Sequence, residues 1–175
     1  MTDRDQGTAR RLRDAFDRSF AEPVAVKPTT ASLLFLRVGG DPYALRLSEV
    51  AGLHRDKTIA AATSPLQDLL GMAGFRGVIA PVYDLGILLG YPRARAPRWI
   101  LLARGPAPVA LAFETFEAHF HVEVEQLASG GSSSTRPYLE GALREANGTR
   151  ALIHVASIVE ALLVRARTSG PEKER

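Results

Sequence analysis

Hydrophobic and polar residues alternate in short runs from Ser32 onward, and turn-forming residues separate these runs. Runs of this length that are rich in β-branched and aromatic residues are typical of β-strands. The pattern predicts strands at Leu33–Val38, Tyr43–Leu47, Val50–Leu53, Arg76–Val82, Trp99–Ala103, Val109–Phe113, Ala118–Val124, Tyr138–Arg144 and Arg150–His154. Many short strands with frequent turn signals favour barrels or a sandwich over a parallel α/β sheet.

Two dipeptides between these strands predict hairpins. Gly39-Gly40 can supply the positive φ angles that a tight turn requires, and Asn147-Gly148 is the strongest short hairpin signal in the chain. By its composition, the Gly-Gly-Ser-Ser-Ser run at 130–134 is a flexible surface loop.

An amphipathic helix is predicted over Thr8–Phe20, with Leu12, Phe16 and Phe20 on one stripe and Pro23 after its end. Such a stripe can dock on the chain's own domain, and it also leaves open a partner-binding or disordered arm. Shorter helices are expected around Pro65–Leu70 and at Ala156–Arg165. The expected organisation is an arm and linker at 1–30, one folded unit at 31–165 and a tail at 166–175.

Composition supports a folded domain of ordinary size. The chain has 175 residues, 46% of them hydrophobic and 23% charged, enough for one domain or two small lobes with a common core. Cysteine is absent, which excludes disulfides, thiolate metal sites and a cysteine nucleophile. No secretory signal and no apolar run of about 20 residues is found, so we expect a soluble cytoplasmic protein without membrane insertion.

Catalytic motifs are scarce. The chain contains no Walker A run, no G-x-G-x-x-G and no G-x-S-x-G. Glu117, His119, His121 and Glu123 alternate and would share one strand face. This pattern fits a solvated polar face, and it also leaves open a metal-dependent enzyme that uses His119 and His121.

A basic segment offers a second alternative, a nucleic-acid-binding barrel. Arg93, Arg95, Arg98 and Arg104 fall within twelve residues that contain no acid. Only Tyr91 and Trp99 are available nearby for base stacking, and the net charge of the chain is only +3. The sequence therefore does not favour nucleic acid as a partner.

The most distinctive block is residues 71–85, GMAGFRGVIAPVYDL, followed by Leu88-Leu89-Gly90. Gly71 and Gly77 bracket a tight approach of the backbone, Pro81 indicates a bulge or an unpaired strand edge, and Asp84 can cap the apolar helical run after it. Arg76 lacks an obvious acidic partner in the sequence. A buried ion pair and a contact to another protein are both open for it.

This block resembles the signature of the CheW family of chemotaxis coupling proteins, which reads roughly G-h-x-N-L-R-G-x-h-h-P-V-h-D-L, where h is apolar. Further likeness lies, in the same order as in the family, in the opening hairpin 34–47, the strand pair 99–113 and the closing segments 138–141 and 151–155. Together these stretches cover about residues 32–164.

The resemblance implies a mostly β fold of two five-stranded, SH3-like β-barrel lobes with a few short helices, no catalysis and no cofactor. Proteins of this family are adaptors in bacterial chemosensory signalling. They bind the cytoplasmic tip of a chemoreceptor, a methyl-accepting chemotaxis protein, in an apolar groove between the lobes. They also bind the regulatory domain of a CheA-type histidine kinase, itself CheW-like, or another CheW-like protein.

By position, Val50, Gly71 and Arg76 match family residues tied to receptor or kinase coupling, and Leu53, Phe75 and Phe116 are apolar groove candidates near them. The chain also departs from the family. Gly52 stands on the partner-facing strand where a glutamate is usual, Gly74-Phe75 replaces Asn-Leu, and His119 replaces an apolar residue of a core strand. Because Gly52 removes a carboxylate, we expect receptor binding to be kept and kinase binding to be weakened or lost.

Overall fold

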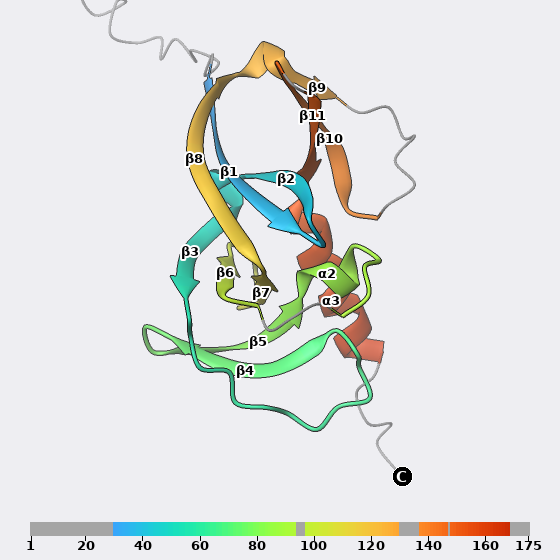
Figure 1. The fold of residues 1–175 in the computed structure, drawn as a ribbon. Coiled ribbons are helices and arrows are strands. Elements are labelled where there is room, and N and C mark those ends of the chain that lie inside the picture. Colours follow the sequence, from blue (N-terminus) through green and yellow to red (C-terminus); the bar gives the residue numbers. More distant parts are fainter. Residues whose placement is uncertain (1–29, 94–96, 130–136, 147, 169–175) are drawn as a thin grey trace, which may run out of the picture.

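Two curved β-sheets form the molecule in a computed structural model (Figure 1). The structure describes residues 30–93, 97–129, 137–146 and 148–168. The first sheet contains β1 (Thr30–Val38), β2 (Asp41–Arg46), β8 (Thr115–Glu123), β9 (Leu127–Ser129), β10 (Leu139–Glu145) and β11 (Gly148–Ile153). The second contains β3 (Val50–Arg55), β4 (Leu69–Phe75), β5 (Val78–Asp84), β6 (Trp99–Ala103) and β7 (Ala110–Phe113). Short helices η1 (Leu47–Glu49), η2 (Val124–Gln126) and α2 (Leu85–Leu88) connect strands, and α3 (Val155–Thr168) follows β11.

In each curled sheet, the two outer strands follow one another in the sequence. The strand orders are β8-β1-β2-β11-β10-β9 and β3-β6-β7-β5-β4. In the first sheet the outer strands β8 and β9 are joined by η2 alone, and in the second the segment 56–68 joins β3 to β4. The sheets are not closed barrels, but this curl gives two SH3-like lobes. We call them the first lobe and the second lobe.

Strands buried on both faces explain the continuous apolar runs of the sequence. In β1, Leu33 and Phe35 point into the core of the first lobe, whereas Leu34 and Leu36 point into a second apolar layer. In β7, all four residues are buried for the same reason. This second layer lies between the lobes and combines side chains of both sheets with α2 and α3, and we call it the shared core.

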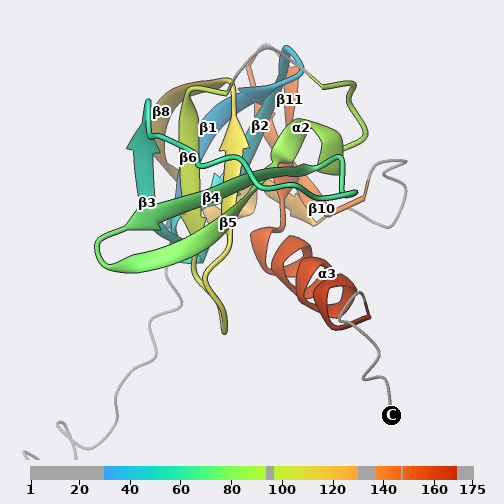
Figure 2. The same ribbon diagram turned by 90° about the horizontal axis from the view of Figure 1, so that it is seen from below.

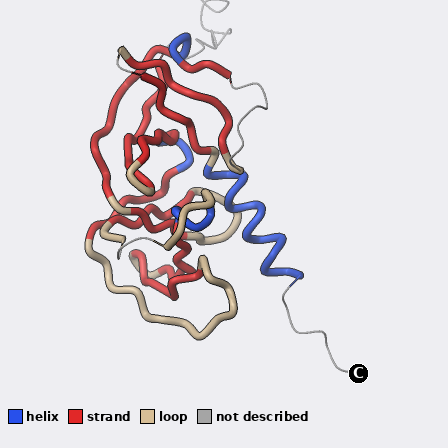
Figure 3. The backbone as a smooth tube through the Cα atoms, turned by 45° about the vertical axis from the view of Figure 1, so that its right-hand side comes forward, coloured by secondary structure: helices blue, strands red, loops and turns tan. Residues whose placement is uncertain are grey.

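Helix α3 begins where the two lobes meet and runs beside the second lobe (Figure 3), and the view from below shows it projecting away from the strands (Figure 2). Its residues Ile158, Val159 and Leu162 are buried in the shared core. Glu49 accepts a hydrogen bond from the Ala156 backbone N–H at 2.9 Å, and so caps the first turn.

The far end of α3 is tied down by an ion pair. Arg165 Nη2 lies 2.5 Å from Oδ2 of Asp68, a carboxylate that is 5% exposed. Since Asp68 precedes β4, the pair fixes α3 to the second lobe.

The structure confirms the predicted hairpins and the helix cap. Gly39 and Gly40 have φ of 61° and 85° and connect β1 to β2. Glu145 pairs with Gly148 across the second hairpin, although Asn147 itself lies outside the described residues. Asp84 Oδ1 accepts from the backbone N–H groups of Gly86 and Ile87. Pro81 has no partner on its β7 side, since pairing with β7 begins only at Val82.

Two expectations about local elements were wrong. The segment 65–70 contains no helix, because Leu69 already begins β4, which pairs along β5. Arg76 and Gly77 form a turn, so the next strand begins at Val78 and not at Arg76. The two SH3-like lobes are as expected, and the first sheet carries the short β9 as a further strand that pairs with β10. His119 lies on β8, an outer strand of the first sheet, and its side chain is exposed.

Three predicted segments cannot be compared with the structure. The helix at 8–20, the loop at 130–134 and Arg95 all lie outside the described residues.

Truncating a side chain of the shared core tests its role. Leu36 is 1% exposed and belongs to the shared core, so Leu36→Ala should lower the free energy of unfolding by about 2–5 kcal/mol. The same substitution at Leu47, which is 37% exposed, should cost clearly less. Urea denaturation of both variants measures the difference, and equal losses would contradict a core shared at Leu36.

Candidate protein-binding surface

The β4–β5 hairpin presents Arg76 to solvent. Arg76 and Gly77, with φ of 47° and 88°, form its two-residue turn between the paired residues Phe75 and Val78. The Arg76 side chain is exposed and makes no ion pair with any described residue. The buried ion pair that the sequence left open for this arginine is therefore excluded.

A small cavity brings four of the predicted contact residues together. It has a volume of about 140 Å³ and is lined by Ala51, Gly52, Leu53, His54, Phe75, Arg76 and Leu102. Gly52 and Leu53 come from β3, whereas Phe75 ends β4 and Arg76 follows it in the turn. Because β3 and β4 are the two outer strands of the second sheet, the curl of that sheet creates this cavity, which we call the β3–β4 cavity.

His54 occupies the space beside Gly52. A Cβ atom on residue 52 would lie 3.0 Å from His54 Nε2, so a larger side chain there requires the imidazole to shift. The imidazole packs on Phe75 with ring centroids 5.0 Å apart. His54 was not among the residues expected at this surface, although positions 52 and 54 share a strand face.

Positive charge surrounds the β3–β4 cavity. Burial lowers the pKa of His54, and the nearby charges of Lys57 and Arg76 lower it further. The Lys57 ammonium lies 5.3 Å from the centre of the Phe75 ring. With His54 mostly neutral at pH 7, Lys57 and Arg76 supply the charge of this rim.

The acid closest to this rim in the sequence, Asp56, is already paired. Arg98 donates to both of its carboxylate oxygens, at 3.0 and 2.9 Å. These hydrogen bonds, together with the charges of Arg98 and Arg55, lower the pKa of Asp56. Asp56 therefore leaves the positive charge of Lys57 and Arg76 uncompensated.

The other predicted contact residues lie elsewhere. Val50 is 6% exposed and its side chain belongs to the shared core. Gly71 allows the backbone of Ala60 to pair with Met72, because a Cβ atom on residue 71 would lie 2.1 Å from the Ala60 carbonyl oxygen. The structure thus assigns a packing role to both positions.

Phe116 lies where the two lobes meet. Its ring centroid is 5.2 Å from that of Trp99, a contact between β8 of the first lobe and β6 of the second. Leu53 lies diagonally opposite Trp99 across the β3–β6 pair, and all three side chains are partly buried against the shared core. We call Leu53, Trp99 and Phe116 the interlobe rim, which the Arg55 guanidinium covers at 5.6 Å from the Trp99 ring.

The histidines predicted on one strand face are indeed neighbours. His119 and His121 are exposed on β8, with ring centroids 4.9 Å apart. Glu117 is instead engaged by Arg37 and Arg150, at 2.6 and 2.8 Å. Within the described ranges, no group of three or more histidine, aspartate or glutamate residues could hold a metal ion.

The basic segment does not form one continuous patch in the described part of the chain. Arg93 donates to the Gln67 carbonyl oxygen, Arg98 binds Asp56, and Arg104 donates to the Val50 carbonyl oxygen. Each of these three guanidiniums is thus directed toward a different part of its own chain.

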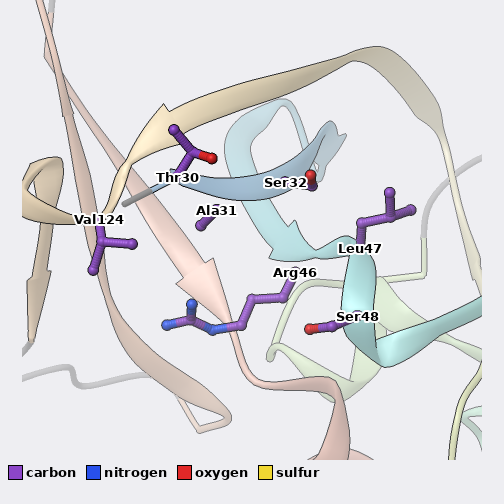
Figure 4. Close-up of a pocket in the computed structure, with 7 residues that line it drawn as sticks. All are labelled: Thr30, Ala31, Ser32, Arg46, Leu47, Ser48 and Val124. Atoms are coloured by element: carbon purple, nitrogen blue, oxygen red, sulfur yellow. The ribbon is translucent and has the colours of Figure 1, made fainter. Parts of the chain in front are cut away.

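A larger pocket, of about 450 Å³, lies on the first lobe and was not expected from the sequence (Figure 4). It is lined by Thr30, Ala31, Ser32, Arg46, Leu47, Ser48 and Val124. Its one charged side chain, Arg46, donates to Glu140 at 2.8 Å. The Glu140 carboxylate therefore compensates the charge of this lining arginine.

Comparison with known proteins now identifies the family. The model of the CheW-like domain matches residues 32–162. The chain belongs to the CheW-like domain family. A solved structure of the scaffolding protein TtCheW from Thermoanaerobacter tengcongensis matches with a TM-score of 0.67 and 16% identity, covering 74% of this chain and 92% of that protein. This match confirms the CheW-like fold.

No curated protein matches the sequence. None of the helices described here is long and apolar enough to cross a lipid bilayer.

Titration of His54 tests the electrostatics of the β3–β4 cavity. We expect its NMR titration midpoint to lie below 6.5, the ordinary pKa of histidine, and to rise in Arg76→Gln, because one repelling charge is removed. Since the unfolded chain binds the proton more readily, the His54 contribution to stability is present above pH 6.5 and is lost as the pH falls below that value. A midpoint unaffected by Arg76→Gln would contradict this arrangement.

Proposed function

We propose that this CheW-like chain is a noncatalytic adaptor of a chemosensory array, which binds the cytoplasmic tip of a chemoreceptor and binds a CheA-type kinase weakly or not at all. The observation that carries the proposal is the family match over residues 32–162. The meeting of Gly52, Leu53, Phe75 and Arg76 at one surface cavity supports it, because these residues were expected to contact partners.

The interlobe rim supports the receptor part of the proposal. Leu53, Trp99 and Phe116 come from both lobes and remain partly accessible over the shared core. An amphipathic helix that lays its apolar face on such side chains gains about 25 cal/mol for each Å² removed from water, less the cost of association. A helical receptor tip is a partner of this kind.

The β3–β4 cavity supports the weakened kinase contact. A glutamate at position 52 would offer a partner negative charge, whereas Gly52 with Lys57 and Arg76 nearby offers only positive charge. A kinase domain that presents a basic residue to this strand would meet like charges, which cost affinity.

Receptor binding is tested by isothermal calorimetry with a purified receptor cytoplasmic domain. Phe116→Ala should weaken binding about tenfold or more, equivalent to about 1.4 kcal/mol, because a central aromatic contact is lost. Leu47→Ala, on the first lobe away from the interlobe rim, is the control and should bind as the natural chain does. Tight binding to the kinase regulatory domain with no receptor binding would overturn the proposal.

Restoring the carboxylate tests the kinase part. Gly52→Glu combined with His54→Ala, which clears the space that the new side chain needs, should strengthen binding to the kinase regulatory domain about tenfold. Gly74→Glu adds the same charge at an exposed position of β4 with open space around it, and should change binding little. Equal gains in both variants would point to net charge alone and contradict a specific role for position 52.

A further inference from the structure

His119 and His121 are the only pair among the four histidines of the chain whose rings lie in contact. Both are exposed on β8, which is an outer strand of the first sheet. Alternate residues of a strand project from the same side, so both imidazoles face solvent together. Neither ring is buried, and neither belongs to any of the three apolar core clusters of the described residues.

The separation of the two rings suits a shared metal ion. Imidazole nitrogens bind zinc at about 2.0–2.1 Å, so two rings on one ion, at an angle of about 90–110°, have centres about 4.5–5.3 Å apart. The observed separation is 4.9 Å, with an angle of 64° between the ring planes. This separation of the ring centres is compatible with one shared ion, toward which each ring must direct one nitrogen.

A hydrogen bond already orients one of the ligands. Ser32 Oγ lies 3.0 Å from His121 Nδ1. In the tautomer in which Nδ1–H donates to this hydroxyl, Nε2 carries the free lone pair. A second hydrogen bond of this type commonly fixes histidine ligands in metal sites.

The protein supplies two ligands to this site, because the neighbouring carboxylate of Glu117 is already paired with arginines. Glu117 is held by Arg37 and Arg150, and no third ligand from the described residues completes the set. We propose that His119 and His121 form a two-imidazole binding site for a divalent transition metal ion, zinc, copper or nickel, with its other coordination positions open to water or to a partner's side chain. Imidazole prefers these ions over magnesium and calcium.

Metal titration of the untagged 175-residue chain tests this site. Isothermal calorimetry with Zn²⁺ should give one saturable site per chain, whereas Mg²⁺ should give none. His119→Ala and His121→Ala should each lower the Zn²⁺ affinity by more than about tenfold. A loss of about tenfold is typical of substitutions at residues that only support the ligands. His54→Ala and His154→Ala are matched controls and should bind Zn²⁺ as the natural chain does.

NMR gives a second, independent measurement. Substoichiometric Cu²⁺ should broaden the imidazole signals of His119 and His121 and leave those of His54 and His154 sharp. Undiminished Zn²⁺ binding in the folded double variant, or broadening of all four histidines alike, would overturn the proposal. Neither outcome depends on the receptor or the kinase, so the proposed adaptor function is tested separately.

Discussion

One apolar layer shared by two curved sheets determines the rest of this structure. Strands β1 and β7 are buried on both faces because each contributes one face to its own lobe and the other to the shared core. The lobes therefore do not have independent interiors, and a change in the shared core affects both. Helix α3 completes this layer and is held at its two ends, by Glu49 and by the Arg165–Asp68 ion pair.

The sequence predicted the elements that depend on local residue patterns. It did not predict the strands that form only because a neighbouring strand pairs with them. Tight turns with glycine and strands with continuous apolar runs were found. The strand β4 was missed because Gly71 and Gly74 interrupt its apolar pattern, and it becomes a strand through pairing with β5. The short β9 has no periodic signal and is extended only because β10 pairs with it.

Residues of the candidate surface could be predicted from the sequence, but their meeting at one cavity could not. The family resemblance pointed to Gly52, Leu53, Phe75 and Arg76, and the β3–β4 cavity unites them because the second sheet curls until its outer strands approach. His54 was missed, since only the three-dimensional contact with Phe75 reveals that it fills the place beside Gly52. Arg76 is exposed because it lies in a turn, whereas the sequence predicted that a strand begins at this residue.

The second lobe is contiguous in the chain, from β3 to β7, whereas the first lobe combines β1 and β2 with strands that follow β7. As the ribosome releases the polypeptide, the second lobe can pair all five of its strands while β1 and β2 still wait for β8 and β11. Nascent chains stalled in this interval expose the apolar side chains of β1. Chaperones that bind extended hydrophobic segments would meet this protein there, well before synthesis ends.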